Sequence, residues 1–100
     1  MNYKIIISIE AEKDINEAYC YYEKEKSGLG DRFLVELDNF YKKLERHPTY
    51  YSFVSEEKII RSLKLKVFPY KIIYEIAGEE LYVFAVHHTS RHDDHFLNRL

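Results

Sequence analysis

Hydrophobic residues recur along this chain with two different periods, and each change of period marks the boundary of a predicted element. Residues 3–8 form a short isoleucine-rich run, which predicts a first strand. From Glu10 the apolar residues recur every three or four positions and predict an amphipathic helix, whose buried stripe consists of Ala11, Ile15, Ala18 and Tyr22. Gly28 then supplies a helix stop, because glycine accepts the left-handed conformation that closes a helix.

A second stripe with helical spacing follows Gly30 and ends before Pro48. Its members are Phe33, Leu34, Leu37, Phe40, Tyr41 and Leu44. Proline disfavours helical geometry in the residue before it, so this helix is expected to end near His47. Two helices joined by a few residues fold back on each other, and the sequence therefore predicts an antiparallel helical hairpin.

The partner of the hairpin lies in the second half of the chain, where the period becomes two. Polar and apolar residues alternate over 62–67 and again over 70–76, with Phe68 and Pro69 between the two runs. Residues 77–79 provide a turn to a third strand. The run 81–86 is almost wholly apolar, which predicts a central strand covered on both sides.

These elements predict one α+β domain over residues 1–100. We expect an N-terminal strand and an antiparallel helical hairpin packed on a mostly antiparallel four-stranded sheet. The polar tail 90–100 is able to form a short C-terminal helix of one or two turns. No internal repeat or linker interrupts the pattern.

Composition narrows the class of protein. The chain is 46% hydrophobic and 32% charged, which excludes a disordered tail, a collagen-like rod and a low-complexity linker. The longest uncharged apolar stretch, 81–86, is far shorter than the about 20 residues that cross a bilayer. The N-terminus shows no signal-peptide cleavage site, and the single cysteine, Cys20, cannot form an internal disulfide. We therefore expect a soluble cytoplasmic protein with no membrane contact and with Cys20 as a packing residue.

Charge is distributed unevenly. Acidic residues outnumber basic ones over 1–57, whereas basic residues outnumber acidic ones over 58–100, and no acid interrupts 58–74. Cations that share a face can bind phosphate, so the nucleic-acid-binding candidates are Arg61, Lys64, Lys66 and Lys71. The alternative is that these residues keep exposed strands soluble and protect a sheet edge.

Histidines gather after the apolar strand. His87 and His88 end it, and Ser90 and Arg91 follow, a combination able to transfer protons near neutral pH. Alternatively, one of the two adjacent histidines faces inward as a hydrogen-bonded core residue. The further residues His92, Asp93 and His95 match no compact metal motif, so no metal ion is expected.

Two other features bear on function. The chain has no glycine-rich phosphate loop, nucleophile elbow or HExxH motif, so no cofactor is expected. Ten tyrosines include the adjacent pairs 21–22 and 50–51, which could stack on bases or on a partner. Closure of a small core by large amphipathic residues explains most of the tyrosines more simply.

Several short motifs in this order and spacing resemble the RelE/ParE superfamily of bacterial type II toxins, also called plasmid stabilisation proteins. The resemblance covers nearly the whole chain. The matching segments are Ala11-Glu12-Lys13-Asp14-Ile15, Tyr21-Tyr22, Gly28-Leu29-Gly30-Asp31-Arg32-Phe33, Pro48, Phe68-Pro69-Tyr70-Lys71-Ile72-Ile73-Tyr74 and Val83-Phe84-Ala85-Val86-His87-His88-Thr89-Ser90-Arg91.

The resemblance implies a toxin that inhibits growth and is neutralised by a cognate antitoxin protein. RelE-like members cut mRNA in the ribosomal A site without a metal, whereas ParE-like members poison DNA gyrase. In a RelE-like enzyme, Lys64, Lys66, Lys71 and Arg91 would hold and stabilise the phosphate, and His87 or His88 would be the general acid or base. The catalytic candidates are therefore Lys64, Lys71, His87, His88 and Arg91.

The choice of target rests on departures from the RelE-like pattern. Ribosome-dependent toxins are usually strongly basic, whereas this chain has a pI near 6.2 and no tyrosine after Tyr82. Its Gly-Leu-Gly-Asp-Arg-Phe and His-Thr-Ser-Arg segments are more similar to the ParE-type branch. The sequence therefore favours gyrase inhibition, with ribosome-dependent mRNA cleavage as the alternative and a decayed member that binds only its antitoxin as a third.

Overall fold

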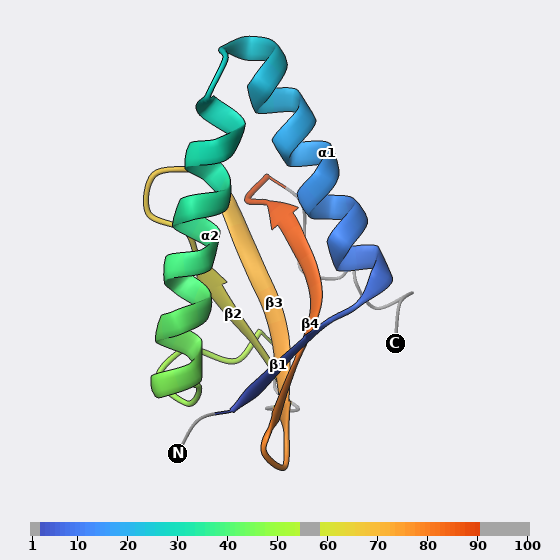
Figure 1. Ribbon diagram of the computed structural model, residues 1–100. Coiled ribbons are helices and arrows are strands. Elements are labelled where there is room, and N and C mark those ends of the chain that lie inside the picture. Colours follow the sequence, from blue (N-terminus) through green and yellow to red (C-terminus); the bar gives the residue numbers. More distant parts are fainter. Residues whose placement is uncertain (1–2, 55–58, 91–100) are drawn as a thin grey trace.

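The computed structural model describes residues 3–54 and 59–90 of the chain. Six elements follow one another, and Figure 1 shows the two helices side by side as a hairpin over the sheet. They are β1 (Lys4–Ile7), α1 (Ile9–Glu25), α2 (Leu29–Arg46), β2 (Ile60–Lys64), β3 (Tyr70–Ala77) and β4 (Glu80–His88). The predicted tail helix lies outside the described residues.

The four strands form one sheet in the order β1-β4-β3-β2. β1 runs parallel to β4, while the pairs β4–β3 and β3–β2 are antiparallel. This arrangement confirms the predicted α+β fold, the mostly antiparallel sheet and the central position of the apolar strand. β3 is interior as well, which its alternating sequence did not reveal.

Both predicted helices form close to their expected bounds. Ser8 caps α1, because its hydroxyl oxygen accepts a hydrogen bond from the Ala11 amide at 3.0 Å. Gly28 adopts a left-handed φ of 88° between the helices, as a glycine at this position allows. α2 ends at Arg46, just before the His47 and Pro48 pair.

A core of aromatic and aliphatic residues fills the space between the helices and one face of the sheet. Phe33 of α2 lies at its centre with an exposed fraction of 0%. The rings of Tyr22, Phe68 and Tyr70 surround Phe33 at centroid distances of 5.2–5.7 Å. The predicted stripes supply these contacts, although Leu34, expected among them, lies on the flank of α2 and is 38% exposed.

The strand β2 departs from its predicted bounds. The alternation predicted a strand over 62–67, but β2 spans Ile60–Lys64 and Val67 is 69% exposed. The amides of Val67 and Phe68 donate hydrogen bonds to the Glu36 carboxylate of α2, at 2.8 and 3.1 Å, instead of to a strand. The chain turns there, and the ring of Phe68 enters the core.

Neither helix of the described chain is both long enough and apolar enough to span a membrane.

Candidate functional site

Three of the predicted site residues form a row across the sheet, on the face opposite the helices. Lys64 of β2 is the register partner of Lys71 in β3, and Lys71 is the partner of His87 in β4. Directly paired residues project from the same face of a sheet. Ile72 next to Lys71 belongs to the helix-side core, so Lys71 projects from the other face. The hairpin therefore brings Lys64 and Lys71, two of the cations that the sequence singled out, side by side.

The three residues of this row differ sharply in exposure. Lys64 is exposed, whereas the exposed fractions of Lys71 and His87 are 6% and 1%. Burial of a charged group costs free energy unless the fold compensates the charge. Lys64 is therefore accessible to a phosphate from solvent, whereas Lys71 and His87 are enclosed within the fold.

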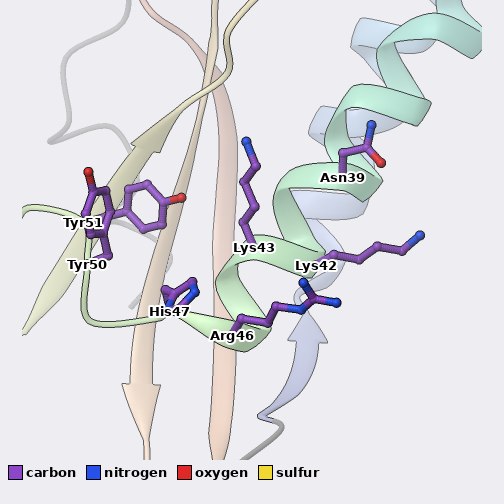
Figure 2. A pocket seen from close by; sticks show the side chains of 7 residues that line it. All are labelled: Asn39, Lys42, Lys43, Arg46, His47, Tyr50 and Tyr51. Carbon is purple, nitrogen blue, oxygen red and sulfur yellow. The ribbon is translucent and has the colours of Figure 1, made fainter.

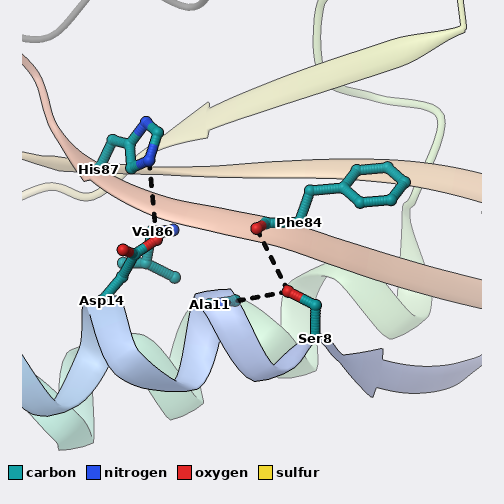
Figure 3. A network of polar contacts seen from close by, with 6 residues as sticks. All are labelled: Ser8, Ala11, Asp14, Phe84, Val86 and His87. Atoms are coloured by element: carbon teal, nitrogen blue, oxygen red, sulfur yellow. Dashed lines mark hydrogen bonds and ion pairs between the residues drawn. The ribbon is translucent and has the colours of Figure 1, made fainter. Parts of the chain in front are cut away.

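An acidic side chain reaches the end of this row from α1. Asp14 is 8% exposed, and its Oδ2 accepts a hydrogen bond of 3.0 Å from the amide of Val86. Figure 3 shows the same oxygen facing the ring of His87, whose Nε2 lies 3.7 Å away. That distance is an ion-pair contact if the imidazole is protonated and is too long for a hydrogen bond. Asp14 can therefore orient and stabilise a charged His87.

The position of Asp14 follows from the topology. The pairing of β1 with β4 ends at Val83, and the amide of Ser8 donates to the Val83 carbonyl at 3.1 Å. The Ser8 hydroxyl continues this edge by donating to the Phe84 carbonyl at 3.2 Å. Asp14 then takes the next free donor of β4, which is the amide of Val86. Helix α1 thus replaces β1 as the neighbour of β4 at this end of the sheet.

The burial of Asp14 was not among the expectations from the sequence, where this residue appeared only within a motif of the first helix. A signal was present, because Asp14 is three residues after Ala11 and four before Ala18. Both alanines are buried, at 0% and 2% exposure, and therefore define the inward stripe of α1. An acid on that stripe needs a partner inside the fold.

His88 contacts a different set of groups. Its ring packs edge-on against Tyr70 at a centroid distance of 5.3 Å, and its Nδ1 lies 2.8 Å from the Ser90 hydroxyl. Both histidines line a small cavity of about 160 Å³ between α1 and the end of β4. The other lining residues are Asp14, Glu17, Ala18, Tyr21, Tyr70 and Val86. Two imidazoles and two carboxylates around one cavity could exchange protons with a small bound group.

The remaining candidates lie apart from this cluster. The guanidinium of Arg61 donates to the carbonyls of Thr49 and Tyr51, at 3.1 and 2.6 Å, and lies 3.9 Å from the ring centroid of Phe53. Arg61 therefore anchors the segment after α2. Lys66 is exposed in the turn after β2 and lines a separate groove with α2. Arg91 lies outside the described residues.

The described part of the chain holds no group of three His, Cys, Asp or Glu side chains arranged to bind a metal ion. The cluster places a buried carboxylate, Asp14, beside a buried imidazole, His87, and has an exposed cation, Lys64, at the other end of the row. Proton transfer and phosphate binding use side chains of these types.

Comparisons with known proteins agree with this fold. The family described as "ParE toxin of type II toxin-antitoxin system, parDE" matches residues 5–93. Among solved structures, the chromosomal ParDE system from P. aeruginosa matches with a TM-score of 0.75 and 16% identity, over 86% of this chain and 95% of the other. The RelBE2 toxin–antitoxin complex from Mycobacterium tuberculosis matches with a TM-score of 0.64 and 18% identity, over 88% and 99%. No curated protein matches the sequence.

Proposed function

Since the chain belongs to the family of ParE toxins of type II toxin–antitoxin systems, we propose that it inhibits growth by acting on DNA gyrase. The observation that carries the proposal is the family match, which spans both helices and all four strands. Gyrase is a cytoplasmic enzyme, so the toxin would act in the cytoplasm.

The exposure of the strand cations favours gyrase over RNA cleavage. Cleavage next to a ribose 2′-hydroxyl needs cations at the phosphate and a proton donor and acceptor within reach of the reacting oxygens. Lys71 and His87 are buried, and Arg61 is bound to backbone carbonyls. Lys64 is the exposed member of the row. The described strands thus present fewer accessible cations and proton-transfer groups to a phosphodiester than a ribonuclease site requires.

Ribosome-dependent mRNA cleavage is the second candidate function, and the pairing of Asp14 with His87 favours it. A carboxylate beside an imidazole stabilises the protonated ring, as a general acid requires. In that reaction His87 or His88 would transfer the proton, and Lys64 and Lys71 would stabilise the negative phosphorane. Access to His87 would then require the surrounding chain to move when the RNA binds.

The proposed function includes a cognate antitoxin as partner. The two solved structures compared above are of toxin–antitoxin systems. This chain has a groove of about 470 Å³ between α2 and the turn after β2, which includes Phe40 and the exposed side chains Val35 and Val67. Lys43 and Lys66 also line it. An acidic amphipathic segment of the antitoxin would complement both the apolar and the charged parts of this groove.

Two assays on the purified protein separate the candidate targets. The first follows supercoiling of relaxed plasmid by purified gyrase, where we expect inhibition that the antitoxin relieves. The second follows mRNA integrity by primer extension in a ribosome-programmed translation reaction, where we expect intact message. Lys64→Gln is the matched variant, because it removes the exposed charge of the row without touching the core.

Other combinations of results in the two assays would support a different function. Cleavage of translated messages, lost in Lys64→Gln, with normal supercoiling would overturn the gyrase proposal and establish the ribonuclease. Normal supercoiling together with intact messages would indicate a member that binds its antitoxin and has lost its toxic activity.

A further inference from the structure

A basic groove lies between the C-terminal end of α2 and the segment that follows the helix. It has a volume of about 770 Å³, and Figure 2 shows cationic side chains of α2 on one side and two tyrosines on the other. Its lining residues are Asn39, Lys42, Lys43, Arg46, His47, Tyr50 and Tyr51. We call this surface the α2 groove.

The cations of the α2 groove come from one end of the helix. Lys42 forms an ion pair of 3.3 Å with Asp38, and the Nζ of Lys43 lies 4.4 Å from the ring centroid of Phe40. Basic residues in the last turn also suit the negative end of the helix dipole. The dipole explains why cations gather here but gives no reason for aromatic side chains beside them.

The two tyrosines supply that second feature. Tyr50 is 80% exposed, and its ring lies edge-on to that of Tyr51 at a centroid distance of 5.1 Å. Tyr51 is half-buried, and burial together with the neighbouring Tyr50 raises the pKa of its phenol above the ordinary value. An exposed aromatic ring beside cations is the arrangement on which bases stack while phosphates bind the charges.

The α2 groove continues toward the strand row. A neighbouring hollow of about 690 Å³ shares Tyr50 and Tyr51 with the groove and extends along residues 52–54 and 62–64. Its last lining residue is Lys64, the exposed member of the row. The tyrosines thus lie between the cations of α2 and Lys64 on one connected surface.

We propose that this surface binds single-stranded nucleic acid, with phosphates on Lys43 and Arg46, bases on Tyr50 and Tyr51, and the strand continuing toward Lys64. An acidic peptide would also be attracted by the cations, but it would gain little from a tyrosine face as open as that of Tyr50. The inference goes beyond the proposed function, because gyrase inhibition by protein contact alone does not require it.

Fluorescence anisotropy with labelled 12-residue oligo(dT) and oligo(U) tests the proposal. We expect Tyr50→Ala to weaken binding about tenfold, which corresponds to the loss of one stacked base. Arg46→Gln should weaken binding and lower the salt dependence by about one counterion. Tyr50→Phe should bind as the wild type does, because the ring is retained.

A matched control lies on α1, where Lys13 is exposed and lines neither the α2 groove nor the neighbouring hollow. Lys13→Gln should leave oligonucleotide binding unchanged. Equal binding by Tyr50→Ala and wild type would overturn the proposal. Competition by polyglutamate as strong as that by unlabelled oligonucleotide would also overturn it, in favour of an acidic protein partner.

The gyrase assay on the same variants keeps the two proposals distinguishable. Gyrase inhibition that persists in Tyr50→Ala, together with lost oligonucleotide binding, supports the nucleic-acid site and separates it from toxicity. Wild-type protein that inhibits gyrase but binds neither oligonucleotide would overturn the nucleic-acid site alone.

Discussion

The two faces of the sheet differ in what they bury. The face under the helices buries aromatic and aliphatic side chains, with Phe33, Phe68 and Tyr74 among them. The opposite face has a smaller apolar cluster of Ile60, Ile73 and Ala85, next to the buried Lys71 and His87. Apolar burial stabilises a fold, whereas buried ionisable groups generally do not stabilise it more than apolar residues would. The helix-covered face thus supplies the larger apolar core, and the opposite face holds the buried site candidates Lys71 and His87.

The largest effect is expected in the helix-covered core. Phe33→Ala removes the ring at the centre of the aromatic cluster and leaves a cavity, which should lower the free energy of unfolding by about 3–5 kcal/mol. Urea denaturation followed by circular dichroism measures the change. Leu34→Ala is the matched control on the same turn of α2, since Leu34 is 38% exposed. Equal losses in the two variants would contradict the central role of Phe33.

The next largest loss of stability is expected where the two helices approach each other closely. A Cβ added at Gly30 would lie 2.8 Å from the Tyr19 carbonyl oxygen of α1, so the helices would have to separate. Gly30→Ala should therefore destabilise the protein by about 1–3 kcal/mol. Thermal unfolding compares it with Ser27→Ala in the exposed connection. A Gly30→Ala variant as stable as wild type would show that the hairpin tolerates a wider spacing.

Asp14 lies where the two faces meet, and two substitutions separate the effect of its hydrogen bond from the effect of its charge. Asp14→Ala leaves the Val86 amide without its acceptor and should cost about 1–3 kcal/mol. Asp14→Asn keeps an oxygen for that amide but removes the charge beside His87, so it should be less destabilising. Denaturation and the pH titration of His87 by NMR measure the two effects separately. Identical stability of both variants would contradict the hydrogen-bonding role.

A smaller effect on stability is expected at two tyrosines whose hydroxyl groups are buried. The Tyr74 hydroxyl donates to the Pro48 carbonyl at 2.6 Å, whereas the Tyr41 hydroxyl is buried with no hydrogen-bond partner among the residues that the structure describes. Tyr74→Phe should therefore lower the free energy of unfolding by about 1 kcal/mol, and Tyr41→Phe should be neutral or stabilising. Chemical denaturation checks both. A larger loss in Tyr41→Phe than in Tyr74→Phe would reverse this assignment.

The smallest effect on stability is expected at the exposed end of the row. Lys64→Gln should change the free energy of unfolding by less than about 0.5 kcal/mol, because the side chain is exposed on β2. Binding to oligonucleotide should nevertheless weaken, which anisotropy measures. A marked loss of stability would show that Lys64 belongs to the fold rather than to the binding surface.

The helix-covered face was predictable because each of its elements carries its own signal. The 3–4 residue spacing of Phe33, Leu37, Phe40 and Leu44 defines the stripe of α2, and Gly28 and Pro48 mark its ends. These are local properties of the chain, and the structure confirms them. The strand after residue 60 was less predictable, because the turn at Val67 depends on Glu36, which is distant in sequence.

The opposite face was less predictable because the alternation within one strand does not determine how deeply its side chains are buried. The alternation of β3 predicts a half-buried strand, but both Lys71 and Ile72 are buried. The pairing of Lys64 with Lys71 followed from the hairpin, whereas their difference in exposure did not. Arg61 was grouped with them by charge, yet its contacts turn it toward Thr49 and Tyr51.

The superhelical density of a reporter plasmid, measured in cells after induction of the toxin, tests gyrase inhibition in its natural setting. We expect negative supercoiling to be lost within the period of growth arrest. We also expect Lys64→Gln to have the same effect and the antitoxin to prevent the loss. Growth arrest with unchanged plasmid supercoiling, together with cleaved messages in the same cells, would contradict gyrase inhibition.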